Sequence, residues 1–294
     1  MIKQSVLAGP VLVIGAAGKT GLAVTRALSA RGVPVRAAVR GPASYDVVRA
    51  AGAVEQVVID LESGAGLDQA MAGVGAVYHL APNVHPDEIG IAARVVAAAE
   101  AALVPRLVFH SVLHPHDAAM PHHLRKADAE QVVRAGRPAW TILQPAAYLQ
   151  NLLEPALAGR IEVPYSLDAP FTNVDLADVA EAAARVLTEP GHERATYELA
   201  GPLTTVRGLA AVATEVLGRE VEAAELDLRQ WVRGPGAALP DHVRDDLLAM
   251  FTAYDACGLA GNDRGLGMLL GRPPRSWRAL LAQSQVTGVS PPGG

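Results

Sequence analysis

Short apolar runs alternate with longer helix-forming stretches along the first half of this chain. Each run is bounded by glycine, proline or polar residues, which is typical of buried strands. The pattern predicts strands over residues 11–14, 34–40, 55–60, 75–81, 106–111 and 140–145. It predicts helices between them, over 22–28, 44–51, 67–72, 88–103 and 121–135. Strands and helices in this alternation indicate an α/β fold built on a doubly wound parallel sheet, and the long helices exclude an antiparallel sandwich.

The last third of the chain has a mixed pattern. A single amphipathic helix is predicted over 171–187, capped by Asn173 or Asp175, and Thr205 is expected to cap a helix over 206–217. Short strands are expected at 195–200 and 221–226, and further helices at 228–232 and 240–257. These elements suggest a smaller lobe of mixed α/β structure beside the sheet.

Composition narrows the class of protein. Hydrophobic residues make up 50% of the 294 positions, charged residues 19%, and the net charge is -5, with no basic surplus that would suggest a nucleic-acid partner. The single cysteine, Cys257, excludes an intramolecular disulfide and fits a cytoplasmic protein. No apolar run approaches the roughly 20 residues that a membrane helix requires.

Three glycines follow the first predicted strand at positions 15, 18 and 21, directly before a helix-forming run. Glycine lets a backbone turn sharply and approach a pyrophosphate, and the first N–H groups of a helix bind anions. Within this loop Lys19 adds a cation and Thr20 a hydroxyl. We expect the loop to bind a dinucleotide through Gly15, Ala17, Gly18, Lys19, Thr20 and Gly21. The alternative is a tight turn without a ligand.

Arg40 bears on the choice of dinucleotide, because it closes the second predicted strand. An acid at that point accepts hydrogen bonds from the ribose of NAD, whereas an arginine meets the 2′-phosphate of NADP. The first acid after the strand is Asp46. The sequence therefore favours NADP, with NAD as the alternative and a solvated role for Arg40 also open.

Other cofactor contacts are expected where predicted strands end, because ligands of open α/β sheets bind at the carboxyl edge. Asp60 ends the third strand and Leu61 follows it, where an adenine would lie, although Asp60 could instead cap the next turn. The remaining positions at this edge are Leu80, Ala81, Pro82, Ser111 and Pro145.

His122 and Lys126 are candidate catalytic residues because they share one face of the helix predicted over 121–135. A lysine there can hold nicotinamide ribose hydroxyls, and an imidazole can move a proton near neutral pH. Alternatively, the same residues could simply form a solvent-exposed surface of the helix. Tyr148 and Asn151 leave the sixth strand at the ligand edge, where they could line the substrate or, for Tyr148, form a half-buried aromatic.

Several histidines gather between residues 110 and 123. No cysteine lies nearby and no H-E-x-x-H spacing occurs, which argues against a zinc site. His110 is expected to pack in the sheet, and His114 is a candidate substrate contact. Four large side chains of the last third could form a lid over a flat apolar substrate, although residues at helical spacing are more often core: Trp231, Met250, Phe251 and Tyr254.

Taken together, these motifs resemble the NmrA-like family of atypical short-chain dehydrogenases over roughly residues 11 to 220. The resemblance rests on residues 15–21, Arg40, 111–115, 121–123 with Lys126, 140–151 and 171–180. It implies an NAD(P)-binding Rossmann domain with a small carboxyl-terminal lobe over the nicotinamide. Ordinary short-chain dehydrogenases carry a tyrosine four residues before the lysine. Here His122 stands in its place, so the usual proton donor is missing.

From this resemblance we expect a Rossmann domain over 11–150, to which 171–200 returns. A substrate lobe is expected over 151–170 and 201–285, with a disordered lead-in over 1–10 and a tail over 286–294. The expected activity is NADP(H)-dependent reduction of an aromatic or quinone-like small molecule, in a chain that could form a homodimer. A quinone accepts hydride to give a stabilised phenolate, which fits the missing acid. The alternatives are a tailoring enzyme of aromatic natural-product or antibiotic biosynthesis and a non-catalytic redox sensor.

Overall fold

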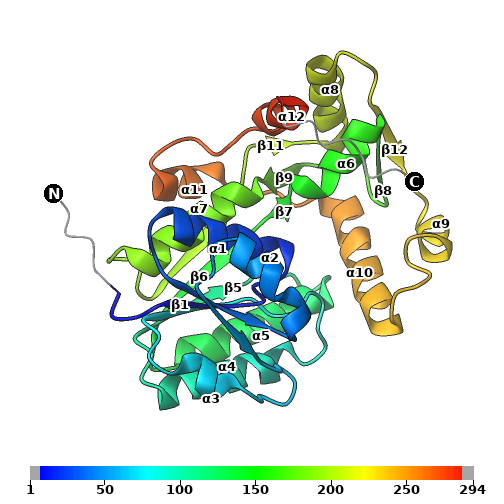
Figure 1. Cartoon of the computed structure of the whole chain (residues 1–294). Helices are drawn as coiled ribbons and strands as arrows, with labels where there is room; N and C mark the ends of the chain where they lie inside the picture. The colour runs from blue at the N-terminus through cyan, green and yellow to red at the C-terminus, as the bar shows by residue number, and fades with distance from the viewer. Residues whose placement is uncertain (1–6, 287–294) are drawn as a thin grey trace. The chain divides into compact units, whose positions relative to one another are not determined.

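The computed structural model describes residues 7–286 (Figure 1), so the expected lead-in before residue 7 and the expected tail after residue 286 lie outside the described residues. Contacts within the chain group it into two units. The first contains the residues up to 116, 122–144 and 179–197. The second contains 117–121, 145–178 and the residues from 198 onward. The domain boundaries expected from the sequence stay a prediction.

Seven strands of the described residues form one sheet in the order β10-β6-β5-β4-β1-β2-β3. The strands are β1 (Val11–Ile14), β2 (Val35–Val39), β3 (Glu55–Val58), β4 (Ala76–His79), β5 (Arg106–His110), β6 (Ala139–Pro145) and β10 (Ala195–Leu199). The neighbours from β3 to β6 all pair in parallel. This confirms the predicted doubly wound α/β fold.

Helices flank this sheet on both sides (Figure 1). They are α1 (Lys19–Ala30), α2 (Tyr45–Ala50) after the 3-10 turn η1 (Pro42–Ser44), α3 (Leu67–Met71), α4 (Glu88–Ala101), α5 (Pro121–Ala135) and α7 (Leu176–Thr188). On one face, buried strand residues such as Ile14 and Phe109 pack with Val95 of α4 and Val133 of α5. The central strands β1 and β4 are buried at every residue because helices cover both faces of the sheet.

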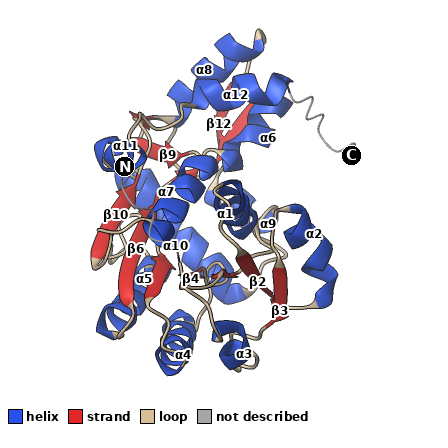
Figure 2. Ribbon diagram, turned by 60° about the vertical axis from the view of Figure 1, so that its left-hand side comes forward, coloured by secondary structure: helices blue, strands red, loops and turns tan. Residues whose placement is uncertain are grey.

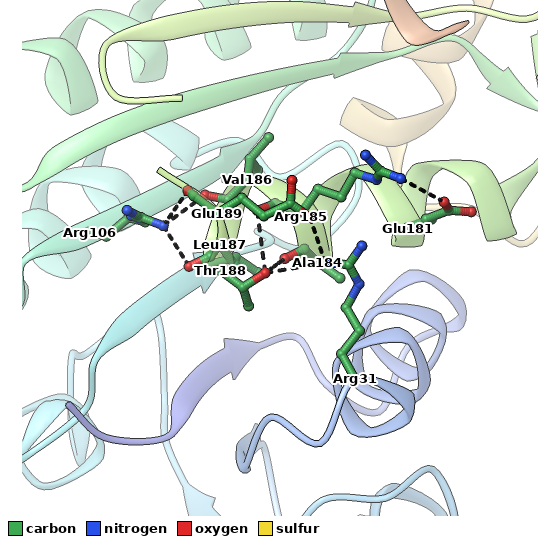
Figure 3. A network of polar contacts seen from close by, with 9 residues as sticks. All are labelled: Arg31, Arg106, Glu181, Ala184, Arg185, Val186, Leu187, Thr188 and Glu189. Carbon is green, nitrogen blue, oxygen red and sulfur yellow. Dashed lines mark hydrogen bonds and ion pairs between the residues drawn. The ribbon is translucent and has the colours of Figure 1, made fainter. Parts of the chain in front are cut away.

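Two arginines bind the carboxyl end of α7 (Figure 3). The last carbonyls of a helix have no partner within it. Arg106 satisfies them by donating from Nη1 to the carbonyls of Leu187 at 2.8 Å and Glu189 at 3.0 Å. Arg31 pairs with the Glu189 carboxylate at 2.9 Å. A cation at this helix end is also favoured by the helix dipole.

The second unit contains two small sheets, β11-β9-β7 and β12-β8, of which Figure 2 labels the strands β9 and β12. Its strands are β7 (Ala147–Tyr148), β8 (Arg160–Val163), β9 (Phe171–Val174), β11 (Leu203–Thr204) and β12 (Glu222–Glu225). Its helices are α6 (Gln150–Ala158), α8 (Val206–Leu217), α9 (Leu228–Arg233), α10 (Asp241–Cys257), α11 (Asp263–Leu270) and α12 (Trp277–Val286). Its core includes Trp277, whose indole N–H donates to the Leu209 carbonyl at 3.0 Å.

The prediction of one helix over 171–187 is wrong at its start. Residues 171–174 form strand β9, and α7 begins only at Leu176. Asp175 is the cap, because its Oδ1 accepts a hydrogen bond from the Ala177 N–H at 2.6 Å, whereas Asn173 lies within the strand. The predicted cap at Thr205 is confirmed, since its side chain accepts from the Gly208 N–H.

Among the helices of residues 7–286, none combines the length and the apolar character that crossing a membrane would take.

Candidate functional site

Two of the three loop glycines are required by the fold itself. Gly15 has φ +74°, and a Cβ there would lie 2.9 Å from the Leu80 carbonyl oxygen. A Cβ on Gly21 would lie 2.2 Å from the Gly15 carbonyl oxygen. Both positions therefore need glycine so that β1, the turn and α1 can pack together.

Gly18 is different, because neither its backbone nor its packing requires glycine. Its φ of -77° is ordinary, and the nearest atom to a Cβ there would be the Gly15 oxygen at 3.5 Å, a normal contact. Gly18 is the N-cap of α1, and no side chain caps this helix end. A small N-cap leaves the first-turn N–H groups open to an anion, so the loop fits the pyrophosphate of a dinucleotide.

The strand order places this loop at the point where ligands bind in such sheets. Between β1 and β4 the order reverses direction, which is the topological switch point. The tight approach of Gly15 to Leu80 shows that the loops after β1 and β4 meet there. Of the predicted contacts after β4, Leu80 is half-buried, Ala81 is buried and Pro82 is exposed. Arg40 follows β2 directly and is exposed.

The Asp60 carboxylate accepts hydrogen bonds from the turn that follows it. One carboxylate oxygen accepts from the Glu62 N–H at 2.9 Å, and the other accepts from the Ser63 hydroxyl at 2.6 Å. These bonds, the Ser63 hydroxyl first, lower the pKa of Asp60 below its usual value. The capping interpretation of Asp60 therefore has direct support, while contacts of Asp60 and the neighbouring Leu61 with an adenine stay predictions.

Backbone strain marks the loops that follow β4 and β5. Val84 has φ 50° although it is β-branched and buried, and His114 has φ 54°. Such conformations cost on the order of 1 to 3 kcal/mol and gather at functional sites. His123 stabilises the strained conformation of His114, because its ring Nδ1 is hydrogen-bonded to the His114 carbonyl at 3.1 Å.

Lys126 lies inside the first unit and is only 7% exposed. It forms an ion pair with Glu88, which is 1% exposed, and it donates from Nζ to the His110 carbonyl at 3.3 Å. An ammonium group has three N–H donors, so one is left for a ribose hydroxyl. Its predicted role can therefore coexist with the ion pair, and Glu88 is a site residue that the sequence analysis missed.

Two histidines lie beside this pair on neighbouring strands. His110 is hydrogen-bonded through Nδ1 to the Tyr78 hydroxyl at 2.5 Å, whereas neither ring nitrogen of the fully buried His79 has a hydrogen-bond partner in the described part of the chain. Burial, and secondarily the Lys126 charge, lowers the pKa of each histidine to about 3. We call Tyr78, His79, Glu88, His110 and Lys126 the buried polar cluster.

His122 is buried, which changes what it can do. Burial, followed by the charge of His123, lowers the pKa of His122 to about 3. The ring is therefore neutral near pH 7, and the catalytic role expected of His122 stays a prediction. The two rings meet edge to face, with centroids 4.5 Å apart. The interpretation of this helix start as a wet surface is wrong for His122 and Lys126, which are both buried.

Ser111 is buried and bound to a second carboxylate that the sequence analysis missed. Its hydroxyl donates to Glu130 at 2.6 Å, and Gln144 donates to the same oxygen at 2.8 Å. Arg134 pairs with the other oxygen at 3.1 Å, so the fully buried Glu130 is satisfied on both sides. Neither Glu88 nor Glu130 could be recognised from the sequence, because a glutamate in a helix is ordinarily a surface residue.

The second unit brings five rings together, which we call the aromatic cluster. Tyr165 stacks on Phe171 with centroids 5.3 Å apart, and Tyr254 meets both edge to face. The predicted substrate residues Trp231 and Phe251 contact each other at 5.0 Å and join the cluster through Tyr165. Tyr165 was not singled out in the sequence, and no periodicity marks it.

The remaining predicted substrate and cofactor residues of the second unit lie outside that cluster. Tyr148 is half-buried in β7, Asn151 is exposed on α6, and Pro145 is buried at the end of β6. Within residues 7–286, no group of three or more His, Cys, Asp or Glu side chains is placed to hold a metal ion.

Comparison with known proteins decides the family. Residues 8–269 match the model of the NmrA-like family. The chain belongs to this family. The same family was expected from the motifs, and that prediction is confirmed.

Several known reductases match along nearly the whole chain. A (4-alkanoyl-5-oxo-2,5-dihydrofuran-3-yl)methyl phosphate reductase of Streptomyces griseus is 33% identical, with 93% of this chain and 97% of the relative covered. An NAD(P)H azoreductase of Xenophilus azovorans is 29% identical over 91% and 95% of the two chains. The NADPH-dependent quinone oxidoreductase of Escherichia coli, solved with NADPH, is 26% identical over 93% and 99%, with a TM-score of 0.80. All three are reductases by name, which confirms the prediction of a reductase.

Proposed function

We propose that this protein is an NADPH-dependent reductase of aromatic or quinone-like small molecules. The observation that carries the proposal is Gly18, a glycine that the chain's own conformation and packing do not require. It stands at the start of α1, beside the switch point of the sheet, where a pyrophosphate is bound in folds of this kind. Two of the relatives named above, the azoreductase and the quinone oxidoreductase, use NAD(P)H or NADPH by name.

Each part of the dinucleotide has a group in the first unit that suits it. The loop from Gly15 to Gly21 offers backbone N–H groups to the pyrophosphate, and Lys19 adds a positive charge. Arg40, exposed directly after β2, suits a 2′-phosphate, which favours NADPH over NADH. Lys126 keeps one N–H donor for a ribose hydroxyl, and Glu88 fixes the direction of its ammonium group.

The nicotinamide, when bound, supplies the hydride. The chain's own residues bind and orient it, and they exclude water from the site. Because His122 is neutral near pH 7, the protein stores no imidazolium acid at that position. Substrates whose reduced form carries a stabilised oxyanion, such as quinones, suit this arrangement, since they need no strong acid for the hydride step.

The test is a titration of the wild-type protein and the variant Gly18→Ala with NADPH and NADH by calorimetry. We expect wild type to bind NADPH at least about tenfold more tightly than NADH, and the variant to lose roughly tenfold or more in NADPH affinity, about 1.4 kcal/mol. Because the new methyl group makes only a normal contact, the melting temperature should stay unchanged within about 2 °C.

Gly267→Ala is the matched control, because a Cβ there would also lie 3.5 Å from a backbone oxygen, that of Arg272. It should bind NADPH as wild type does. Absence of binding in wild type, or equal binding by the Gly18 variant, would contradict the proposal. NADPH consumption with a panel of quinones is followed in parallel. Tight binding without consumption would favour the redox sensor instead.

A further inference from the structure

We infer that Tyr165 and Tyr254 form a pair of hydrogen-bond donors for an oxygen atom of the aromatic substrate. This inference rests on the proposed function and adds to it the residues that recognise the substrate. The argument starts from the aromatic cluster of the second unit, where both tyrosines are central and a flat ring would find matching surfaces.

The two phenols lack hydrogen-bond partners within the cluster. In the described residues, neither the Tyr165 nor the Tyr254 hydroxyl makes a hydrogen bond, although a tyrosine as buried as Tyr254, at 6% exposure, usually finds one. Neither oxygen is among the fully enclosed polar atoms without a partner, so both reach open space. Both hydroxyls are therefore unused donors that a ligand at this cluster can reach.

The rings hold these donors in fixed positions. Tyr165 and Tyr254 meet edge to face with centroids 5.5 Å apart, and Phe171 supports both rings, at 5.3 Å and 5.0 Å. Phe171 is fully buried, so the support is rigid. Donors that are held in advance bind a developing charge without reorganising.

The environment also keeps the phenols protonated. Burial raises the pKa of Tyr165 to about 12, and burial followed by Tyr165 and Asp117 raises that of Tyr254 further. Both groups therefore remain donors at any pH at which the fold is expected to work. A carbonyl oxygen suits such a pair, because it gains negative charge when the ring is reduced. The ligand class is thus an aromatic ring that bears a carbonyl or phenolate oxygen.

The experiment measures steady-state kinetics with NADPH and 1,4-naphthoquinone for wild type, Tyr165→Phe, Tyr254→Phe and the double variant. Phenylalanine keeps the ring and removes only the donor. Each single variant loses one hydrogen bond to an oxygen that becomes charged, so we expect kcat/KM to fall about tenfold. The double variant loses both bonds, and its kcat/KM should fall roughly 100-fold. The Kd for NADPH should stay within about twofold of wild type.

Tyr197→Phe is the matched control, because the Tyr197 hydroxyl already bonds to His192 at 2.8 Å in the first unit. It should leave kcat/KM unchanged. A double variant that keeps wild-type kcat/KM would overturn the inference. So would a fall that comes with weakened NADPH binding or a lowered melting temperature, because the phenols would then be structural. Wild type without any quinone turnover would instead refute the proposed function, which separates the two failures.

Discussion

The two units concentrate their unusual residues in clusters of opposite kinds. The buried polar cluster joins a charged pair, Lys126 and Glu88, to two buried histidines. The aromatic cluster consists of five rings in mutual contact. Removing one partner of a buried charged pair leaves an uncompensated charge, whereas replacing one apolar ring by another apolar side chain costs less. We therefore expect the first cluster to be brittle and the second to lose less stability when one ring is replaced.

The strongest test of this contrast is Glu88→Ala, which leaves the Lys126 ammonium buried without its carboxylate. The side chains are 2% and 9% exposed, so little solvent screens the loss. We expect the free energy of unfolding to fall by about 3–5 kcal/mol. Urea denaturation measures it. Glu62→Ala is the control, because Glu62 pairs with His85 through a side chain that is 78% exposed, and it should change stability by less than about 0.5 kcal/mol. If Glu88→Ala lowers the free energy of unfolding by less than about 1 kcal/mol, the buried polar cluster is not brittle.

The second test uses acid. In the folded chain the pKa of His79 is about 3, whereas its ordinary value is 6.5. Between pH 6.5 and pH 3 the unfolded chain therefore binds a proton at this ring and the folded chain does not. The stabilisation is complete above pH 6.5 and is lost as the pH falls towards 3. His79→Leu, which removes a ring without hydrogen-bond partners, should therefore lose about 2 kcal/mol less than wild type between pH 7.5 and pH 5. Urea unfolding at both pH values measures this. An equal loss in the two proteins would show that His79 does not titrate in this way.

The smallest effect is expected in the aromatic cluster. Phe171→Leu keeps most of the buried volume and removes the ring contacts with Tyr165 and Tyr254. A loss of about 1–1.5 kcal/mol is expected, because leucine keeps most of the apolar volume and only the ring contacts are lost. Thermal unfolding gives the value. Val174→Ala, a truncation in the same strand, serves as a comparison for simple loss of volume. A cost at Phe171 that equals the cost at Glu88 would end the contrast between the clusters.

The sequence revealed most of the first unit because its signals are local. The strand 11–14, the glycines after it and the helix that follows are adjacent in the chain, and each apolar run is covered on both faces. The start of β9 was misread because Phe171 to Val174 precede a true cap, Asp175, and four residues carry too little periodicity to separate strand from helix. Strands of two residues, such as β7 and β11, carry none.

The candidate site was less accessible to sequence reasoning, because its parts meet only in space. Glu88 and Lys126 come from different helices, and nothing in either segment marks the other as its partner. The aromatic cluster takes Tyr165 from a loop, Phe171 from β9 and Trp231 from α9. Trp231 and Phe251 were found by size alone. Tyr165 needed the fold to bring it beside Tyr254.

Glu130 has a consequence for the exchange of segments between relatives. Its carboxylate on α5 is shared by Ser111 after β5, Gln144 on β6 and Arg134 on its own helix. A chimaera that imported α5 alone would separate the acid from two of the groups that satisfy it. A working chimaera should therefore take residues 111–144 from one parent. Substitutions of Glu130 and of its partners should be tolerated only when they change together.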